Sequence, residues 1–267
     1  MRMKTYRNRA FFYTLTTLLI LCSAVLLAAP KAGRERLYSV KKQKTSSTTR
    51  CVERFGEAIV LVKSPVGSGS GFLINDDGYI VTNFHVIEGE QNISVTVFRQ
   101  ERKEFRKIKY SKVRIVALDH FFDLALLKLE RPDGDKSLST VTLTKTDDLR
   151  VGDEVFAIGN PLGLTRSVSK GVVSSLNRYL EGKLFIETDT AINPGNSGGA
   201  LFNNRCEVVG VTNMGVAWLQ GLNFAIPIHS VKYFLDHREA YAFDKDNPNT
   251  GFRYLDPPRK AGTTEQK

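Results

Sequence analysis

Residues 70–87 read SGFLINDDGYIVTNFHVI, which is two apolar runs of strand length joined by the turn sequence NDDG. Aliphatic β-branched and aromatic residues favour strands, whereas Asn, Asp and Gly favour turns. Similar runs recur at short spacing along the chain: AIVLV, ISVTVF, KVRIVAL, DLALLKL, DEVFAIG, GVVSSL, LFIETD, EVVGVTN and LNFAIPI. Many short strands at regular spacing predict an all-β sandwich or barrel.

Helical periodicity is confined to one segment in the C-terminal part of the chain. Apolar residues recur at intervals of three and four in VKYFLDHREAY, and Ser230, which precedes this run, is a suitable N-cap. These features predict a helix over residues 230–241. Residues 242–267 are polar and contain prolines, which predicts an unstructured tail. The charged run FRQERKEFRKIKYSK, residues 98–112, predicts a solvated hairpin that projects from the sheet.

The composition is that of a globular protein, because 42% of the 267 residues are hydrophobic and 25% are charged. The net charge of +10 is unevenly distributed: residues 1–50 carry eleven of the 38 basic residues and one of the 28 acidic residues. The remainder of the chain is therefore electrically neutral. A neutral folded region does not favour a nucleic acid as partner.

Residues 10–29 form an uncharged apolar run that follows four basic residues. As a helix rising about 1.5 Å per residue, this run can span a bilayer, and the basic flank predicts that the following chain is exported. We predict a signal peptide or signal anchor over residues 1–29 and a polar basic linker over residues 30–50. The folded part is then extracytoplasmic, in the periplasm or cell envelope, and is anchored by one transmembrane segment or, after cleavage, secreted.

Two cysteines, Cys51 and Cys206, lie outside the apolar run. An oxidising compartment allows them to pair, but nothing in their spacing requires it, so the sequence leaves the disulfide open. The chain has no H-E-x-x-H motif and no Cys/His cluster with the spacing of a metal site. We therefore expect neither a metal nor another cofactor.

Ser197, in the run INPGNSGGALF over residues 192–202, is the candidate nucleophile. A serine hydroxyl needs a base within hydrogen-bond reach, and His85 lies at the end of an apolar strand. A carboxylate must then orient the imidazole. Asp123 precedes the apolar strand LALLKL, and Asp119, which is more typical of a turn, is the alternative. The glycines beside the serine allow backbone N–H groups to converge on an oxyanion.

Five segments resemble, in the same order, motifs of the HtrA branch of the chymotrypsin-like serine proteases. They are GSGSGFLINDDGYIVTNFHVI, DHFFDLALLKL, AIGNPLGLTRSVSKGVVSSL, TDTAINPGNSGGALFN and LNFAIPI, and the resemblance extends over about residues 55–232. It implies the catalytic triad His85, Asp123 and Ser197. It also implies cleavage of polypeptides through an acyl-enzyme, on damaged or specific envelope proteins, and assembly into a homo-oligomer such as a trimer.

The same resemblance implies a fold of two six-stranded antiparallel Greek-key barrels with a C-terminal helix. The trypsin-like protease domain then extends over residues 51–241. Its first barrel lies at about residues 55–138, its second at about residues 139–230, and its helix at about residues 230–241. The polar tail follows over residues 242–267.

The resemblance also assigns the residues that surround the bond to be cleaved. Ala191 lies at the base of the S1 pocket, where no acid attracts Lys or Arg, and Leu222 forms a bulky wall. A short apolar pocket predicts small aliphatic P1 residues such as Val or Ala. The assigned positions are, for the oxyanion hole, Gly195, Asn196 and Ser197, and, for substrate binding, Ala191, Asn213, Met214, Gly215 and Leu222.

Three departures from the family pattern and two alternative functions accompany this interpretation. Phe84 replaces a smaller or polar residue, Ala200 replaces a proline, and no PDZ motif follows residue 232. The run GNSGG also satisfies the G-x-S-x-G motif of α/β-hydrolases, but GGALFNNRCEVVGV predicts strands where that fold needs a helix. The second alternative is an inactive or latent protease fold that serves as a binding or chaperone-like module. The presence of all three triad residues disfavours it.

Overall fold

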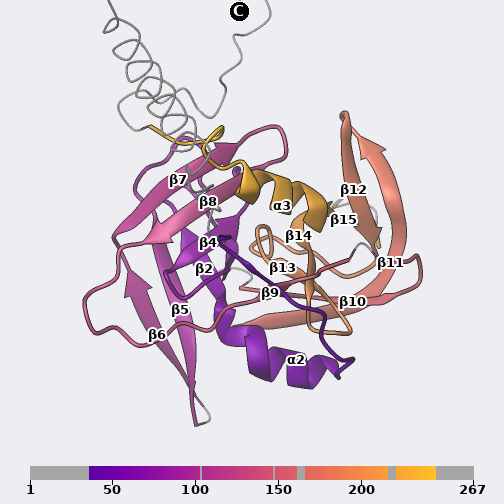
Figure 1. Ribbon diagram of the computed structural model, residues 1–267, viewed down its shortest axis with the longest axis horizontal. Coiled ribbons are helices and arrows are strands. Elements are labelled where there is room, and N and C mark those ends of the chain that lie inside the picture. Colours follow the sequence, from indigo (N-terminus) through magenta and orange to yellow (C-terminus); the bar gives the residue numbers. More distant parts are fainter. Residues whose placement is uncertain (1–35, 103, 147, 161–165, 216–220, 245–267) are drawn as a thin grey trace, which may run out of the picture. The chain divides into compact units, whose positions relative to one another are not determined.

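The computed structural model describes residues 36–102, 104–146, 148–160, 166–215 and 221–244 (Figure 1). The strands in this part of the chain form two sheets whose long strands are antiparallel. This architecture confirms the predicted all-β class with two barrels. The first sheet comes from the N-terminal half of the domain, and the second comes from the C-terminal half together with one short strand at Ser39–Val40.

The first sheet has seven strands in the order β6-β5-β2-β3-β4-β8-β7. One strand more than expected is present because the charged run at residues 98–112 folds back as the predicted hairpin and adds an edge strand, β6. Side chains on the inner strands are almost all buried, whereas those of β6 are mostly exposed. The strands are β2 (Ile59–Lys63), β3 (Ser68–Leu73), β4 (Tyr79–Thr82), β5 (Ser94–Glu101), β6 (Glu104–Tyr110), β7 (Val113–Asp119) and β8 (Leu124–Leu129).

The second sheet closes on itself as a six-stranded ring, because its outer strands β14 and β15 also pair with each other. Two short strands, β1 (Ser39–Val40) and β9 (Thr142–Leu143), extend it by parallel pairing beside β14. The ring consists of β10 (Glu154–Gly159), β11 (Ser167–Leu180), β12 (Lys183–Thr188), β13 (Ala200–Asn203), β14 (Val208–Gly215) and β15 (Asn223–Pro227). Closure leaves no unpaired edge between β14 and β15.

The N-terminal segment does not behave as the predicted linker, because residues 36–50 pack along the second barrel. The Gln43 amide donates to Glu207 Oε1 at 2.7 Å, and the Ser46 amide donates to the carbonyl of Asn204 at 2.8 Å. The Tyr38 hydroxyl donates to Asp236, and burial together with this bond raises the pKa of Tyr38 to about 12. The residues that make these contacts are far apart in the sequence, so the polar composition of the segment does not predict the contacts.

The N-terminal segment up to Phe55 packs here because two strands of the second barrel are apolar on both faces. Along β10, Val155 and Ala157 belong to one hydrophobic cluster, whereas Phe156 and Ile158 belong to another. The face that carries Phe156 and Ile158 must be shielded from water by other apolar side chains. Phe55, at the end of helix α2 (Thr48–Phe55), stacks on Phe202, which in turn stacks on Phe156.

Helix α2 is absent from the sequence-based prediction because it is short and polar. Its N-cap is Ser47, whose hydroxyl accepts a hydrogen bond from the Arg50 amide. Its buried Cys51 forms a disulfide with Cys206, which lies in the turn between β13 and β14. The structure therefore shows the disulfide that the spacing of the cysteines alone does not predict. A single 3-10 turn, Gly56–Ala58, connects α2 to the first barrel.

The C-terminal helix, α3 (Ile228–Asp236), starts two residues before the predicted helix and ends five residues before the predicted end. It begins after Pro227, whose extended conformation caps it, and Ser230 lies inside the helix with its side chain buried. Figure 1 shows α3 beside β14 and β15, and it also contacts β8. The next residues return to the first barrel: the Phe243 amide donates to the carbonyl of Val116. The predicted tail thus has an ordered start, and its remainder from residue 245 lies outside the described residues.

The predicted signal peptide or anchor over residues 1–29 also lies outside the described residues. Within the part of the chain that the structure describes, no helix is both long and apolar enough to cross a membrane.

Candidate active site

The loop that carries Ser197 joins β12 to β13 and passes close to the first barrel. Gly195 and Gly198 have φ angles of +96° and +82°, a region that L side chains rarely adopt. A Cβ atom on Gly198 would lie 2.2 Å from the carbonyl oxygen of Ser70 and 2.3 Å from Thr82 Oγ1. Glycine is therefore required at position 198 for both conformation and space.

His85 and Asp123 lie on the first barrel, just after β4 and just before β8. His85 Nδ1 is 2.7 Å from Asp123 Oδ2, and the His85 amide donates to Asp123 Oδ1 at 2.8 Å. The carboxylate thus accepts from both the ring and the backbone of the histidine. Asp123 has a φ of +56°, which is uncommon for a residue other than glycine. The side chain of buried Asn83 donates to the carbonyl of Asp123 and helps to hold this conformation.

Asp119, the alternative acid, has a structural role in the turn that leads to Asp123. Its Oδ1 accepts a hydrogen bond from the Phe122 amide at 3.0 Å. Burial raises the pKa of this carboxyl group, although the amides of Phe122 and Phe121 act in the opposite direction. Asp119 therefore shapes the turn, and Asp123 is the acid that meets His85.

Asn213 connects the first barrel to the serine. Its side-chain amide donates to Asp123 Oδ2 at 2.6 Å, and its backbone carbonyl accepts the hydroxyl of Ser197 at 2.8 Å. The structure thus brings His85, Asp123 and Ser197 around one asparagine. Among the hydrogen bonds of the described residues, none joins the hydroxyl of Ser197 to the imidazole of His85. The sequence predicted Asn213 only as a partner for substrate backbone.

The three backbone amides predicted for an oxyanion hole are not equivalent. The Asn196 amide donates to the carbonyl of Asn193 at 2.9 Å and is therefore engaged within the loop. The amides of Gly195 and Ser197 have no acceptor among the described residues. Two N–H groups, and not three, are thus free to bind an incoming oxygen.

The comparison with known protein families agrees with this geometry. A family model described as "Trypsin-like peptidase domain" matches residues 69–211. The chain belongs to the trypsin-like peptidase family. A relative from Halomonas elongata, named a probable periplasmic serine endoprotease of DegP-like type, is 42% identical over 189 residues, which cover 66% of this chain and 37% of the relative. The chain thus spans little more than a third of the length of that curated relative.

Another relative and two solved structures are also similar to this chain. A Synechocystis protein named HhoB, described by its name as a putative serine protease, is 38% identical over 173 residues, or 62% of this chain and 39% of that protein. A serine endoprotease from Yersinia pestis superposes with a TM-score of 0.61 at 31% identity, covering 73% of this chain and 67% of the other. Deg5 gives a TM-score of 0.59 at 34% identity, covering 71% and 94% of the two chains.

The strand predicted to pair with peptide backbone is β14 of this trypsin-like domain. On one side, β14 pairs with β15 as far as Gly215. On its other side, the pairing with β13 ends at Val211, and the Thr212 amide donates to the carbonyl of Gly199. On this second side, the backbone of Asn213, Met214 and Gly215 has no strand partner among the described residues.

The predicted base of the S1 pocket is held by two side chains of the second barrel. The hydroxyl of Ser169 donates to the carbonyl of Ala191 at 2.8 Å, and Asn223 Oδ1 accepts from the Ile192 amide. The acid nearest in sequence, Asp189, accepts a hydrogen bond from the Val172 amide at 2.6 Å. Leu222, the predicted wall residue, packs against the hydrophobic core with a partly buried side chain.

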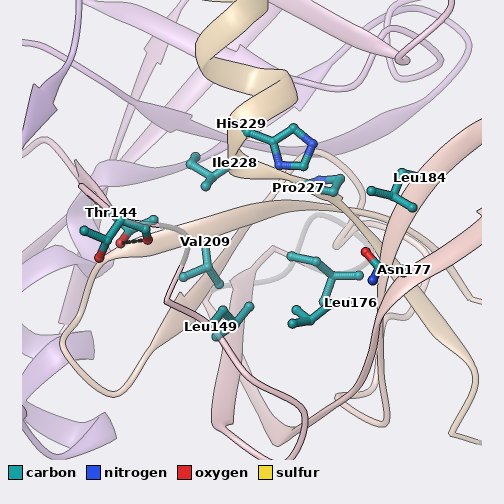
Figure 2. Close-up of a pocket in the computed structure, with 11 residues that line it drawn as sticks. Thr144, Leu149, Leu176, Asn177, Leu184, Val209, Pro227, Ile228 and His229 are labelled. Carbon is teal, nitrogen blue, oxygen red and sulfur yellow. Dashed lines mark hydrogen bonds between the residues drawn. The ribbon is translucent and has the colours of Figure 1, made fainter.

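A pocket of the peptidase domain lies against the smaller hydrophobic cluster of the second barrel. Figure 2 shows its apolar side chains, among them Leu149, Leu176 and Val209, converging beneath the start of α3 at His229. No residue of the candidate triad lines this pocket. Within the described residues, no group of three or more His, Cys, Asp or Glu side chains is arranged to hold a metal ion.

Proposed function

We propose that this chain is a serine endopeptidase that hydrolyses peptide bonds through an acyl-enzyme. The observation that supports this proposal is the shared contact of Asp123 Oδ2 with both His85 Nδ1 and Asn213, whose carbonyl accepts the Ser197 hydroxyl. Membership of the trypsin-like peptidase family supports the same reaction. The α/β-hydrolase alternative is excluded because the residues after Ser197 form strands β13 and β14.

In the proposed reaction, His85 is the general base and Asp123 orients it. A proton on His85 Nδ1 donates to Asp123, which leaves Nε2 free to accept the proton of Ser197. The serine oxygen attacks the scissile carbonyl, and the resulting oxyanion accepts from the amides of Gly195 and Ser197. The imidazolium then protonates the leaving amine. Water, activated by the same imidazole, releases the acyl group and restores the serine.

The Ser197 hydroxyl is not directed at His85 in the described arrangement. The Ser197 hydroxyl donates to the carbonyl of Asn213 and must turn towards His85 before it can lose its proton. His85 is the more exposed partner of its hydrogen-bonded pair, with 44% of its side chain accessible against 20% for Asp123. Its ring is therefore accessible from solvent.

The proposal is tested with a fluorophosphonate probe, which labels only an activated serine. We expect the wild-type chain to be labelled at Ser197, as mapped by mass spectrometry, and the Ser197→Ala variant to remain unlabelled. Ser139→Ala is the matched control, because Ser139 is half-buried and bonded to Glu57, away from the candidate site. Labelling that persists in Ser197→Ala would contradict the assignment of the nucleophile.

The second candidate function is a latent or inactive module that keeps the protease fold for binding. The hydrogen bond from Ser197 to Asn213, in place of one to His85, is the observation that favours it. A well-folded wild-type chain that neither reacts with the probe nor cleaves peptides would support this alternative. The same chain would then be expected to bind unfolded polypeptides without shortening them.

Cleavage after small aliphatic residues is the specificity that we predict. The reasons are the apolar residues Ala191 and Leu222 and the commitment of Asp189 to a backbone amide. With quenched peptides that differ only at P1, we expect kcat/KM for Val or Ala to exceed that for Arg by about 100-fold. Leu222→Ala should shift the preference towards larger apolar residues. Preferred cleavage after Arg would contradict this prediction.

We further propose that the enzyme acts outside the cytoplasm on polypeptides of the cell envelope. The name of the Halomonas elongata relative includes the word periplasmic, and a disulfide between Cys51 and Cys206 suits an oxidising compartment. Attachment to a membrane through residues 10–29 and assembly into a homo-oligomer remain predictions from the sequence.

A further inference from the structure

We propose that Ser70, a residue of the first barrel, is a positioning residue that holds the oxyanion-binding loop of the second barrel in its reactive conformation. This inference rests on the proposed function, since it assigns a role within the same reaction. Ser70 lies on β3 and is fully buried. It touches neither a substrate nor the reacting atoms, and it acts through the backbone of Gly195 and Ser197.

Every polar atom of Ser70 is engaged in a hydrogen bond. Its amide donates to the carbonyl of Ser197 at 2.8 Å, and its hydroxyl donates to the carbonyl of Gly195 at 2.7 Å. The hydroxyl oxygen accepts from the Asn160 amide at 2.8 Å, and the carbonyl accepts from Thr82 Oγ1 at 2.7 Å. One side chain and its backbone thus connect β3 and β4 with the end of β10 and the nucleophile loop.

The direction of the hydroxyl proton is decided by this set of partners. A serine hydroxyl has one proton to donate and lone pairs that accept. Asn160 presents an N–H group, which can only donate, so the oxygen of Ser70 accepts there. The single proton is therefore directed to the carbonyl of Gly195, which can only accept.

Fixing this carbonyl fixes the peptide group that follows Gly195. The peptide bond is planar, so the orientation of the Gly195 carbonyl sets that of the Asn196 amide, which donates to Asn193. Gly195 itself has φ of +96° and no Cβ, so local sterics do not hold it in one conformation. Without the Ser70 hydroxyl, only the bond from Asn196 to Asn193 within the loop holds this peptide group, so the neighbouring amides of Gly195 and Ser197 are held less firmly.

Two glycines allow this contact between the barrels. A Cβ atom on Gly198 would lie 2.2 Å from the carbonyl oxygen of Ser70, and one on Gly69 would lie 2.9 Å from the carbonyl oxygen of Ser197. The glycine-rich run GSGSG therefore serves close approach of two backbones. It places the hydroxyl of Ser70 within reach of a loop 125 residues away in the sequence.

Ser70→Ala tests the proposal, because it removes both bonds of the hydroxyl and leaves the bond from the amide of residue 70 to Ser197. We expect kcat to fall by about 10- to 100-fold, with KM changed by less than about threefold. Inhibition by a peptide aldehyde, whose adduct carries the oxyanion, should weaken by a similar factor. Binding of the cleaved product peptide should not change.

Thr144→Val is the matched control, because it removes another buried hydroxyl that donates to a backbone carbonyl, that of Thr146, away from the candidate site. It should lower the melting temperature without changing kcat. Ser70→Cys, which keeps the volume and a weak donor, should retain more activity than Ser70→Ala and serves if the latter is poorly folded.

The possible results distinguish failure of the positioning role of Ser70 from failure of the proposed protease activity. If the wild type cleaves peptides and both folded Ser70 variants match Thr144→Val in kcat and in aldehyde inhibition, the positioning role is overturned and the protease stands. If KM and product binding change as much as kcat, the role is also overturned, because the defect is then one of binding. A wild type without cleavage or probe labelling overturns the proposed function itself.

Discussion

Replacing His85 by alanine is expected to reduce kcat/KM for peptide hydrolysis by about five to six orders of magnitude, to the limit of detection. The imidazole is the only base in the proposed reaction, and its Nδ1 is held 2.7 Å from Asp123 Oδ2. Without it the serine hydroxyl keeps its proton, and the leaving amine has no acid. Steady-state cleavage of a quenched peptide, with substrate well below KM, measures the effect.

Two further variants make this result specific to the triad. Asp123→Asn should lose about four orders of magnitude, because the amide presents a donor to the imidazole and favours the wrong tautomer. His237→Ala removes an exposed histidine at the end of α3, where its ring bonds the carbonyl of Tyr233, and should leave activity unchanged. A His85→Ala variant within tenfold of the wild type would refute the assignment of the base.

Removing the disulfide between Cys51 and Cys206 is expected to lower the free energy of unfolding by about 2–5 kcal/mol. The two cysteines are 155 residues apart, so the bond closes a loop that contains most of the domain and restricts the unfolded chain strongly. For a domain of this size the loss corresponds to about 4–20 °C in melting temperature. Thermal unfolding of the Cys51→Ala/Cys206→Ala variant, followed by circular dichroism, measures it.

The remaining cysteine provides the control for this experiment. Cys22 lies in the apolar run near the N-terminus, and Cys22→Ser should unfold at the wild-type temperature. A reductant should lower the melting temperature of the wild type and leave that of the double variant unchanged. Equal melting temperatures for the wild type and the double variant would show that the bond adds nothing to stability.

Much of the fold could be predicted because it depends on local patterns of apolar and turn residues. The apolar runs between turn sequences form β2 to β5, β7, β8 and β10 to β15, and the charged run at residues 98–112 forms the predicted hairpin with β6. Side-chain direction alternates along a strand, so a short window of sequence carries this information. The packing of residues 36–50 could not be predicted in this way. Its polar residues are ordered by partners such as Glu207, 164 positions from Gln43.

The candidate site likewise has features that the sequence predicts and features that only the tertiary structure shows. The residue types and the turns around His85, Asp123 and Ser197 are local features, so the sequence alone identifies them as candidates. The double contact of Asn213 and the occupied amide of Asn196 are not local features. The signal that could have found Ser70 was the glycine-rich run around it, which indicates that another backbone comes close but does not say which.

By itself, the sequence determined the all-β class, the two successive sets of strands, the serine protease motifs and the uneven charge, because each depends on residues close together in the chain. The tertiary structure alone decided that Cys51 pairs with Cys206, that the N-terminal segment covers the second barrel, and that Asn213 and Ser70 join the two barrels beside Ser197. These contacts connect residues 90 to 164 positions apart. They exist only where the packing of distant elements brings these residues within bonding distance, and no short window of sequence encodes that distance.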